Sequence, residues 1–292
     1  MPSERELKRR LRSVRNIQQV TKAMQTVAAS RMRRAQAATL ASRPYEERLR
    51  TVLHELGPYA EPEDHPLLAR RPRERALIVL VTSDRGLVGA MNTNLIRAAL
   101  RFAQRQRAAS YVAVGRKGIS AMRRLRSPIV AEFTGLGDRP TSTDTNVVAR
   151  VAGEEFVAAR VDEVYLAFTR FVNTLRQEPT VRRILPLVPA EEEMAGGPRG
   201  TEPPGTLQYI FEPDAQGVLA AVLPRLVEVS IYQAVLESKA SEQSARMVAM
   251  RNASDAAEEM IEDLTLTYNK ARQDQITREL LDLVGGAEAL SG

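Results

Sequence analysis

The hydrophobic positions near the start of the chain follow a helical rhythm. Ser3 and Glu6 form the pair that typically caps the first turn of a helix. Small and apolar residues then recur at spacings of three and four, close to the seam of a coiled coil: Leu7, Leu11, Val14, Ile17, Thr21, Met24, Ala28, Met32, Ala35 and Ala38. Pro44 should kink this helix without ending it. The pattern therefore predicts a first coiled-coil helix over residues 1–57.

The last part of the chain repeats this rhythm. Sixty residues from Arg225 to Val284 contain neither Gly nor Pro. Their stripe is again made of small and apolar residues: Val227, Ile231, Ala234, Ser238, Ala245, Ala249, Ala253, Ala256, Met260, Leu264, Tyr268 and Ala271. A helix of this length, about 90 Å, is typical of a coiled coil, and we expect Gly285-Gly286 to end it. A second helix is thus predicted over residues 214–286, and its Ala-rich seam should bury little apolar area.

Between the two helices the pattern changes to short apolar runs that alternate with helical stretches. Residues 76–82 form a continuous apolar run, which is typical of a buried parallel strand. Further strands are predicted at 111–114, 129–133 and 164–169, with a candidate edge strand at 209–212, and helices at 92–107, after Gly118 and at 144–161. This alternation predicts a small α/β, Rossmann-like domain over residues 75–212. The fold class is therefore α/β with a long antiparallel coiled coil. The two terminal helices pair with each other as a shaft, and the α/β domain is inserted between them in the sequence.

Composition argues against several kinds of active site. Aromatic residues make up only 4% of the chain and Trp is absent, which favours helix seams over a broad sandwich or barrel core. The absence of Cys removes disulfides, thiolate metal sites and cysteine nucleophiles together. The two histidines, His54 and His65, stand in a stretch rich in Pro and Glu that is typical of a loop. We therefore expect no catalytic centre, no metal and no cofactor.

The net charge of +6 is spread unevenly. Residues 1–50 hold thirteen Lys/Arg against four Glu, whereas residues 225–292 hold seven against twelve Asp/Glu. Two helices of opposite charge can pair, so the basic one needs no nucleic acid to explain it. We find no apolar run that approaches the ~20 residues of a membrane span and no apolar segment of a signal peptide at the start. These features predict a cytoplasmic or peripheral protein.

Three segments of the middle region could bind a ligand. The turn at residues 82–92 follows the first strand, where a doubly wound domain binds phosphate. It lacks G-x-G-x-x-G, and the chain has no G-x-x-x-x-G-K-[ST], so a capped strand-to-helix turn is the simpler interpretation. The Gly115–Gly118 turn could cradle an anion or merely expose its two cations. The acidic run at residues 191–193 is more typical of a solvated loop than of a metal site.

Three hypotheses about the function of the protein remain open, and two of them concern the polar residues of the terminal helices. Arg246, Arg251, Gln273, Asp274 and Thr277 beside the last seam are either solvated or in contact with a surrounding protein sleeve. The basic first helix could instead bind nucleic acid. Its cations encircle the helix, however, and no aromatic residues interleave with them for base stacking, so a shaft that faces protein partners is preferred. A nucleotide-binding α/β enzyme with helical arms is the third hypothesis, and the missing phosphate loop argues against it.

Separated segments, in the same order, resemble the gamma subunit of F-type ATP synthases over essentially the whole chain. The most specific is 276–287, which is similar to the family's C-terminal signature, I-T-x-E-x-x-[DE]-x-x-x-G-A. Residues 241–250 and 268–273 are similarly close, residues 21–32 resemble the family's first helix, and residues 83–94 its first strand-to-helix turn. The chain departs from the family at Ala90, where a second Gly is usual, and in the loop at 190–204, which matches nothing in it.

This resemblance implies a rotor. Proton flow would turn a membrane c-ring, and the shaft would turn with it inside a ring of alternating alpha and beta subunits. The resemblance assigns alpha- and beta-subunit contacts to Lys22, Met24, Arg246, Gln273 and Thr277. It assigns contacts with the c-ring and the epsilon subunit to Tyr209, Phe211 and Glu212. It further implies no catalytic site in this subunit, no nucleic-acid partner, and indirect membrane association through the c-ring at the cytoplasmic face of a bacterial cell membrane.

Overall fold

The computed structural model describes residues 4–56, 65–187 and 214–291. Its elements in chain order are α1 (Glu4–Leu56), the short 3-10 helix η2 (Pro66–Leu68), β1 (Arg75–Val81), α2 (Met91–Ala103), β2 (Ala108–Val114), α3 (Arg116–Arg124), β3 (Ile129–Phe133), α4 (Ser142–Val157), β4 (Glu163–Phe171), β5 (Gln177–Leu185) and α5 (Ala215–Ser291). The chain divides into two compact units. We call Met1–Ala28 with Arg246–Gly292 the helical unit, and Ala29–Ala245 the sheet unit.

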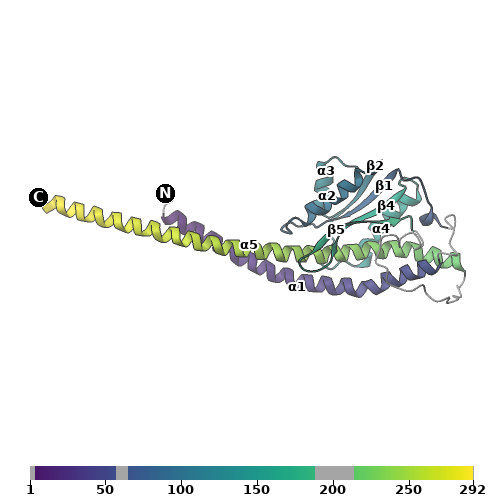
Figure 1. Cartoon of the computed structure of the whole chain (residues 1–292), viewed down its shortest axis with the longest axis horizontal. Helices are drawn as coiled ribbons and strands as arrows, with labels where there is room; N and C mark the ends of the chain where they lie inside the picture. Colours follow the sequence, from purple (N-terminus) through teal and green to yellow (C-terminus); the bar gives the residue numbers. More distant parts are fainter. Residues whose placement is uncertain (1–3, 57–64, 188–213, 292) are drawn as a thin grey trace. The chain divides into compact units, whose positions relative to one another are not determined.

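The sheet unit is built on a five-stranded sheet in the order β3-β2-β1-β4-β5. The first four strands are parallel, and β5 pairs antiparallel with β4 at one edge (Figure 1). Residues 76–81 of β1 are all buried, as expected for a central strand covered on both faces. The predicted combination of an α/β sheet domain with long terminal helices is confirmed.

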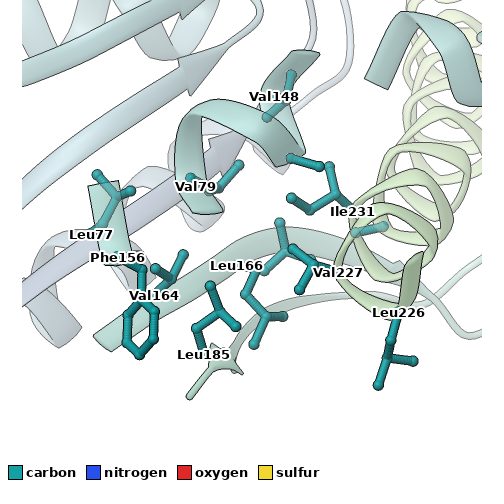
Figure 2. Close-up of a cluster of buried hydrophobic side chains, with 14 of the residues drawn as sticks. Leu77, Val79, Val148, Phe156, Val164, Leu166, Leu185, Leu226, Val227 and Ile231 are labelled. Carbon is teal, nitrogen blue, oxygen red and sulfur yellow. The ribbon is translucent and has the colours of Figure 1, made fainter. Parts of the chain in front are cut away.

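Successive residues of β1 face opposite sides of the sheet, and each side has its own core. Ile78 and Leu80 pack with Leu95 of α2 and Met122 of α3. Leu77, Val79 and Val81 pack on the other side, against α4 and the first turns of α5. The second core is drawn in Figure 2, where side chains of the sheet, α4 and α5 meet: Leu77, Val79, Val148, Phe156, Val164, Leu166, Leu185, Leu226, Val227 and Ile231. Helix α5 is therefore part of the core of the sheet unit as well as a terminal helix.

Within the sheet unit, α1 and α5 run antiparallel along each other. Ser42 donates its hydroxyl hydrogen to the side-chain carbonyl of Gln233. Arg225 Nε donates to the Tyr45 hydroxyl at 3.4 Å. Residue numbers rise along α1 as they fall along α5, which is the antiparallel pairing expected from the sequence. Helix α1 also continues through Pro44 to Leu56, as predicted.

The start of α5 agrees with the predicted residue 214, but its end does not agree with the predicted residue 286. The helix begins ten residues before the Gly- and Pro-free stretch and includes Pro224. Leu219, Leu223 and Leu226 around that proline are fully buried, and their burial outweighs the roughly 3 kcal/mol that an internal proline costs. At the other end the helix passes through the Gly pair at 285–286, where a stop was expected, and continues to Ser291. Glycine lowers helix propensity by about 1 kcal/mol but removes no hydrogen bond.

The sequence analysis missed β5 altogether. Pro179, Arg182 and Arg183 interrupt its apolar pattern, so no strand signal stands out. The strand forms because it pairs with β4 along nearly its whole length and because its arginines meet buried carboxylates, among them Glu46 at 3.2 Å from Arg182. The candidate edge strand at 209–212 lies outside the described residues.

One helix in the described part of the chain reaches the length and apolar character needed to cross a membrane. It is a stretch of α5 with a mean hydropathy of 1.5, and 56% of that stretch is buried within the protein. The expectation that no run comes close to this threshold was therefore too strict. A largely buried core helix satisfies the same criterion, so the finding is weak support for a membrane span.

Candidate functional site

The helical unit is held together by hydrogen bonds between α1 and α5 at widely separated levels. Thr21 Oγ1 lies 3.2 Å from Ser254 Oγ, and both side chains are buried. The Tyr268 hydroxyl donates to Glu4 Oε1 at 2.9 Å. This bond to a carboxylate raises the pKa of Tyr268, since it favours the protonated phenol. The order of these contacts shows that α1 and α5 are antiparallel in this unit too.

The seam between these two helices is thin. Its buried positions are Leu7, Thr21, Ala28, Arg246, Met250, Ser254 and Ala257. The first three belong to the predicted stripe of α1, but the predicted stripe of α5 was wrong in register. Ile17, Ala256 and Met260 were expected in the seam and are exposed. Small side chains allow close backbone approach but remove little apolar surface from water, at about 25 cal/mol per Å². The pair therefore obtains only modest stability from its own contacts.

Beyond the described start of α1, the described residues offer no partner to the end of helix α5. Every residue from Gln275 to Leu281 is exposed. Ile276, Leu280 and Leu283 follow at spacings of four and three, so they share one helix face. They are 44%, 56% and 70% exposed, respectively. We call these three residues the terminal apolar row. The sequence analysis missed it, although the spacing itself was a sufficient signal.

The shaft residues predicted to contact alpha and beta subunits differ in exposure. Lys22, Gln273 and Thr277 are exposed, and Met24 is half-buried. Arg246 is only 8% exposed, so most of its surface already contacts this chain. Sequence spacing could not distinguish this buried arginine from its exposed neighbours on the same helix.

The residues predicted to face the c-ring and the epsilon subunit lie outside the described residues. They are Tyr209, Phe211 and Glu212.

The turn after β1 holds a network of hydrogen bonds within the chain. Asn92 donates from Nδ2 to Ser83 Oγ at 2.7 Å and accepts the Ser83 backbone N–H at 3.1 Å. The Asp84 carboxylate accepts the backbone N–H of Arg116 at 3.0 Å and that of Gly135 at 3.1 Å. These polar groups tie together the carboxyl ends of three neighbouring strands. They support the interpretation of this motif as a structural turn.

The Gly115–Gly118 turn packs closely against the same strand end. Thr82 Oγ1 accepts the Gly118 backbone N–H at 2.8 Å. Gly115 has a φ of +93°, and a Cβ atom there would stand 2.2 Å from the Thr82 carbonyl oxygen. Gly115 is therefore explained by its close approach to the Thr82 backbone and Gly118 by its contact with the Thr82 side chain, without any bound anion.

The crevice that would bind a nucleotide in a doubly wound domain is occupied by α5. In this strand order the crevice lies at the carboxyl ends of β1 and β4, where the chain switches direction across the sheet. Ser241 donates to the Thr169 carbonyl at 3.0 Å, and the Thr169 N–H donates to Ser238 Oγ at 3.3 Å. The remaining cavity between the turns and α5 is about 10 Å³, roughly the space of one water molecule. A nucleotide does not fit there.

A larger hollow of about 1020 Å³ lies between α4 and the first turns of α5. Val147, Val157 and Val227 contribute to its mostly apolar wall, and Asn146 Oδ1 beside it is buried without a hydrogen-bond partner in the described structure. Nowhere in the described residues do three potential metal ligands gather. The hollow therefore has no metal-ligand cluster among the described residues, although charged side chains such as Arg150 and Glu154 contribute to its lining.

Comparison with known proteins identifies close sequence relatives. The model of a protein family described as ATP synthase matches residues 3–290. The ATP synthase gamma chain of Dehalococcoides mccartyi is 48% identical over 295 residues, which cover 100% of both chains. The ATP synthase gamma chain of Roseiflexus castenholzii is 46% identical over 297 residues, covering 100% of this chain and 99% of the relative.

Solved structures share the fold at lower sequence identity. A chain of the Euglena gracilis mitochondrial ATP synthase rotor superimposes with a TM-score of 0.67 at 21% identity, covering 94% of this chain and 98% of that one. A chain of the Tetrahymena thermophila mitochondrial ATP synthase central stalk and c-ring gives a TM-score of 0.58 at 24% identity, covering 80% and 99%. These likenesses support the architecture described above.

Proposed function

The chain belongs to the gamma-chain family of ATP synthases, and we propose that it is the rotor that couples proton-driven rotation of a c-ring to ATP synthesis. A gamma chain is a central stalk subunit of a membrane-associated complex. In the proposed mechanism the chain itself performs no chemistry. It turns inside the ring of alpha and beta subunits, and each orientation favours a different conformation of the catalytic beta subunits.

The terminal apolar row carries this proposal. Three large aliphatic side chains on one face of an unpartnered helix would be costly to leave in water, at roughly 1.5–3 kcal/mol each. Contiguous exposed apolar residues of this kind mark a surface that another protein covers. A surrounding sleeve of alpha and beta subunits would supply that cover for a helix that lacks any from its own chain.

Rotation can select among site conformations only through contacts that differ between orientations. The exposed Lys22, Gln273 and Thr277 and the half-buried Met24 are suited to such contacts, since their side chains remain available around the shaft. Arg246 would act differently, because its burial leaves only part of its surface for a partner. We propose all five as contacts with the alpha and beta subunits.

The remaining parts of the proposal concern the other partners and the location of the complex. We propose that Tyr209, Phe211 and Glu212 face the c-ring and the epsilon subunit. The chain would then lie at the cytoplasmic face of a bacterial cell membrane, attached to it through the c-ring. A subunit without catalysis is supported by the filled crevice at the sheet, which leaves no room for a nucleotide.

The terminal apolar row can be tested by co-expression with the alpha and beta subunits. The test variant replaces the row with serine: Ile276→Ser, Leu280→Ser and Leu283→Ser. A matched control replaces three polar neighbours on the same stretch with serine: Gln275→Ser, Arg278→Ser and Glu279→Ser. Losing about 1.5 kcal/mol of burial at each apolar position predicts a fall of at least 100-fold in affinity for the alpha–beta ring. The control has the same number of serines in the helix and should assemble nearly normally.

Two measurements decide the outcome. Recovery of the complex by affinity purification reports assembly, and ATP hydrolysis by the recovered complex reports coupling. If the apolar-row variant assembles and hydrolyses ATP as well as the control does, the helix end is not enclosed by the ring and the proposed sleeve is wrong. If the wild-type chain recovers none of the alpha, beta, epsilon and c subunits from native membranes, the rotor proposal itself fails.

A further inference from the structure

The two helices α2 and α3 form an unusually basic layer. From Arg85 to Ala131 the sequence contains ten Lys/Arg residues and neither Asp nor Glu. All ten side chains are exposed: Arg85, Arg97, Arg101, Arg105, Arg107, Arg116, Lys117, Arg123, Arg124 and Arg126. Helices α2 and α3 pack on the same face of the sheet, so the cations that these two helices carry lie on one side of the sheet unit (Figure 1). This layer is thus a second basic region of the chain, besides the basic first helix.

The ends of these two helices bring several of the cations together. Helix α2 ends just before β2 and α3 just before β3, and β2 and β3 are parallel neighbours. The two loops therefore lie side by side at the amino end of the sheet. We call the residues Arg105, Arg107, Arg124, Leu125 and Arg126 the basic corner.

Within the described residues, one arginine of the basic corner has an acidic partner. Arg107 forms an exposed ion pair with Glu74. The neighbouring Arg123 is paired with Glu132, but Arg105, Arg124 and Arg126 form no ion pair among the described residues. The corner therefore presents three unpaired guanidinium groups, which are well suited to bidentate recognition of phosphate.

An apolar side chain stands among these arginines. Leu125 is 51% exposed and lies between Arg124 and Arg126 in sequence. Arg126 has a φ of +53°, a left-handed conformation that helix ends usually assign to glycine. An arginine is disfavoured in this conformation, so stability does not account for it. Basic residues around an exposed leucine are the combination that binds a membrane surface, with the cations at the headgroups and the leucine among the acyl chains.

We propose that the basic corner docks on the anionic phospholipid headgroups of a membrane. Charge complementarity favours an anionic surface, and membership of a membrane-associated complex places such a surface within reach. Nucleic acid is a poorer fit, because single strands need exposed aromatic rings for stacking and the one aromatic residue of α2, Phe102, packs against Tyr165 at 4.3 Å. The inference relies on the proposed function only for this proximity to a membrane.

The test measures binding of the full chain to sedimented vesicles. One set of vesicles contains equal parts of phosphatidylcholine and phosphatidylglycerol, and the other contains phosphatidylcholine alone. The corner variant combines Arg124→Gln with Arg126→Gln. The control combines Arg116→Gln with Lys117→Gln, which removes the same charge from the opposite end of the same helix. Each arginine at an anionic bilayer raises the partition coefficient by roughly a factor of five. The corner variant should therefore bind the anionic vesicles about 30-fold more weakly than the wild type, and the control should change much less.

A second measurement reports the depth of the corner directly. The chain contains no Trp, so a single introduced tryptophan gives an unmixed fluorescence signal. Leu125→Trp should shift its emission to shorter wavelength on the phosphatidylglycerol vesicles. Leu87→Trp is the matched control, since Leu87 is 60% exposed at the opposite end of the strands and should show no shift.

Each outcome supports or overturns the proposal. Preferential binding to anionic vesicles, loss in the corner variant and a shift only at position 125 support it. Equal losses of vesicle binding in the two double variants would overturn the proposal, because binding would then depend on total charge and not on the basic corner. Equal binding of the wild type to both kinds of vesicle would mean that no anionic headgroup is recognised. Binding of the wild type to duplex DNA or to an acidic protein, without binding to vesicles, would assign the corner to another partner. Assembly with alpha and beta subunits is measured separately, so failure here leaves the rotor proposal standing.

Discussion

A buried carboxylate between α1, β5 and α5 gives a prediction with a definite sign. Glu237 is 9% exposed. Its Oε1 accepts from Gln233 Nε2 at 3.5 Å and lies 3.9 Å from an Arg43 guanidinium nitrogen. Its Oε2 is buried without a hydrogen-bond partner in the described structure. The ionised carboxylate has therefore lost much of its stabilisation by water, and the polar contacts within the protein replace only part of it.

The balance of these effects raises the pKa of Glu237. Burial is the largest cause, and the nearby Glu46 carboxylate acts in the same direction. Arg43, the Gln233 hydrogen bond and Arg182 oppose it without cancelling it. A carboxyl whose folded pKa lies above its unfolded value contributes fully to stability at pH values below the unfolded pKa. That contribution is lost as pH rises through the folded pKa, because the folded protein must then hold a poorly solvated charge.

The substitution Glu237→Gln removes the charge and keeps the shape of the side chain. Below the ordinary glutamate pKa of about 4.3 the variant and the wild type should have the same free energy of unfolding, since both carry a neutral group. Above it the variant should become the more stable of the two. An unsatisfied buried acceptor costs about 1–3 kcal/mol, so we expect the gain near pH 8 to fall in that range.

The measurement is urea unfolding of the isolated chain, followed by circular dichroism at several pH values. Glu178→Gln is an instructive control, because hydrogen bonds from Arg170 and then Arg176 lower the pKa of Glu178. Its ionised form is favoured in the folded state, so that variant should lose stability relative to the wild type as pH rises. If Glu237→Gln follows the same downward course, the attraction of Arg43 outweighs burial and the reasoning is refuted.

Three further changes probe the fold at separate places, each by thermal or urea unfolding. Gly115→Ala should destabilise the sheet unit by about 3 kcal/mol or more, because the φ of Gly115 is positive and the new Cβ would meet backbone atoms. Gly137 has open space around it, so Gly137→Ala should have little effect. Similar losses of stability in the two variants would contradict the close contact at Gly115. Leu166→Ala should cost about 2–5 kcal/mol, since Leu166 is fully buried beneath α5, and a loss under 1 kcal/mol would mean that this core is loosely packed. Thr21→Val should lower the stability of the helical unit by about 1 kcal/mol through its lost hydrogen bonds, and an unchanged melting temperature would show that they contribute nothing.

The elements that could be predicted from the sequence are those whose pattern is local. The apolar run of β1 and the strand at 129–133 were predicted from their own residues, and the sheet contains both. The stripes of the terminal helices likewise predicted an antiparallel pair. These features depend on the periodicity of a single segment, which is complete within the sequence window that displays it.

The elements that escaped prediction depend on residues far away in the sequence. Strand β5 carries Arg182, which no window of neighbouring residues would place in a sheet, yet Glu46 of α1 accepts from it at 3.2 Å. Arg246 is likewise buried by contacts that its own neighbours in the sequence do not reveal. In each case a tertiary contact overrides a local preference, and only the assembled fold brings the two partners together.

The turn after β1 shows why a fold that suggests a ligand need not bind one. The strand order creates the crevice in which doubly wound domains hold nucleotides. In this chain Ser241 of α5 donates to the Thr169 carbonyl of β4, and Ser238 accepts from the Thr169 N–H. The Asp84 carboxylate accepts a backbone N–H from a neighbouring loop. The groups that could have met a phosphate instead fix a long helix to a sheet. In the proposed rotor these hydrogen bonds, together with the apolar core, would fix α5 to the sheet, because directional bonds at a filled crevice set the position of the helix along the strand.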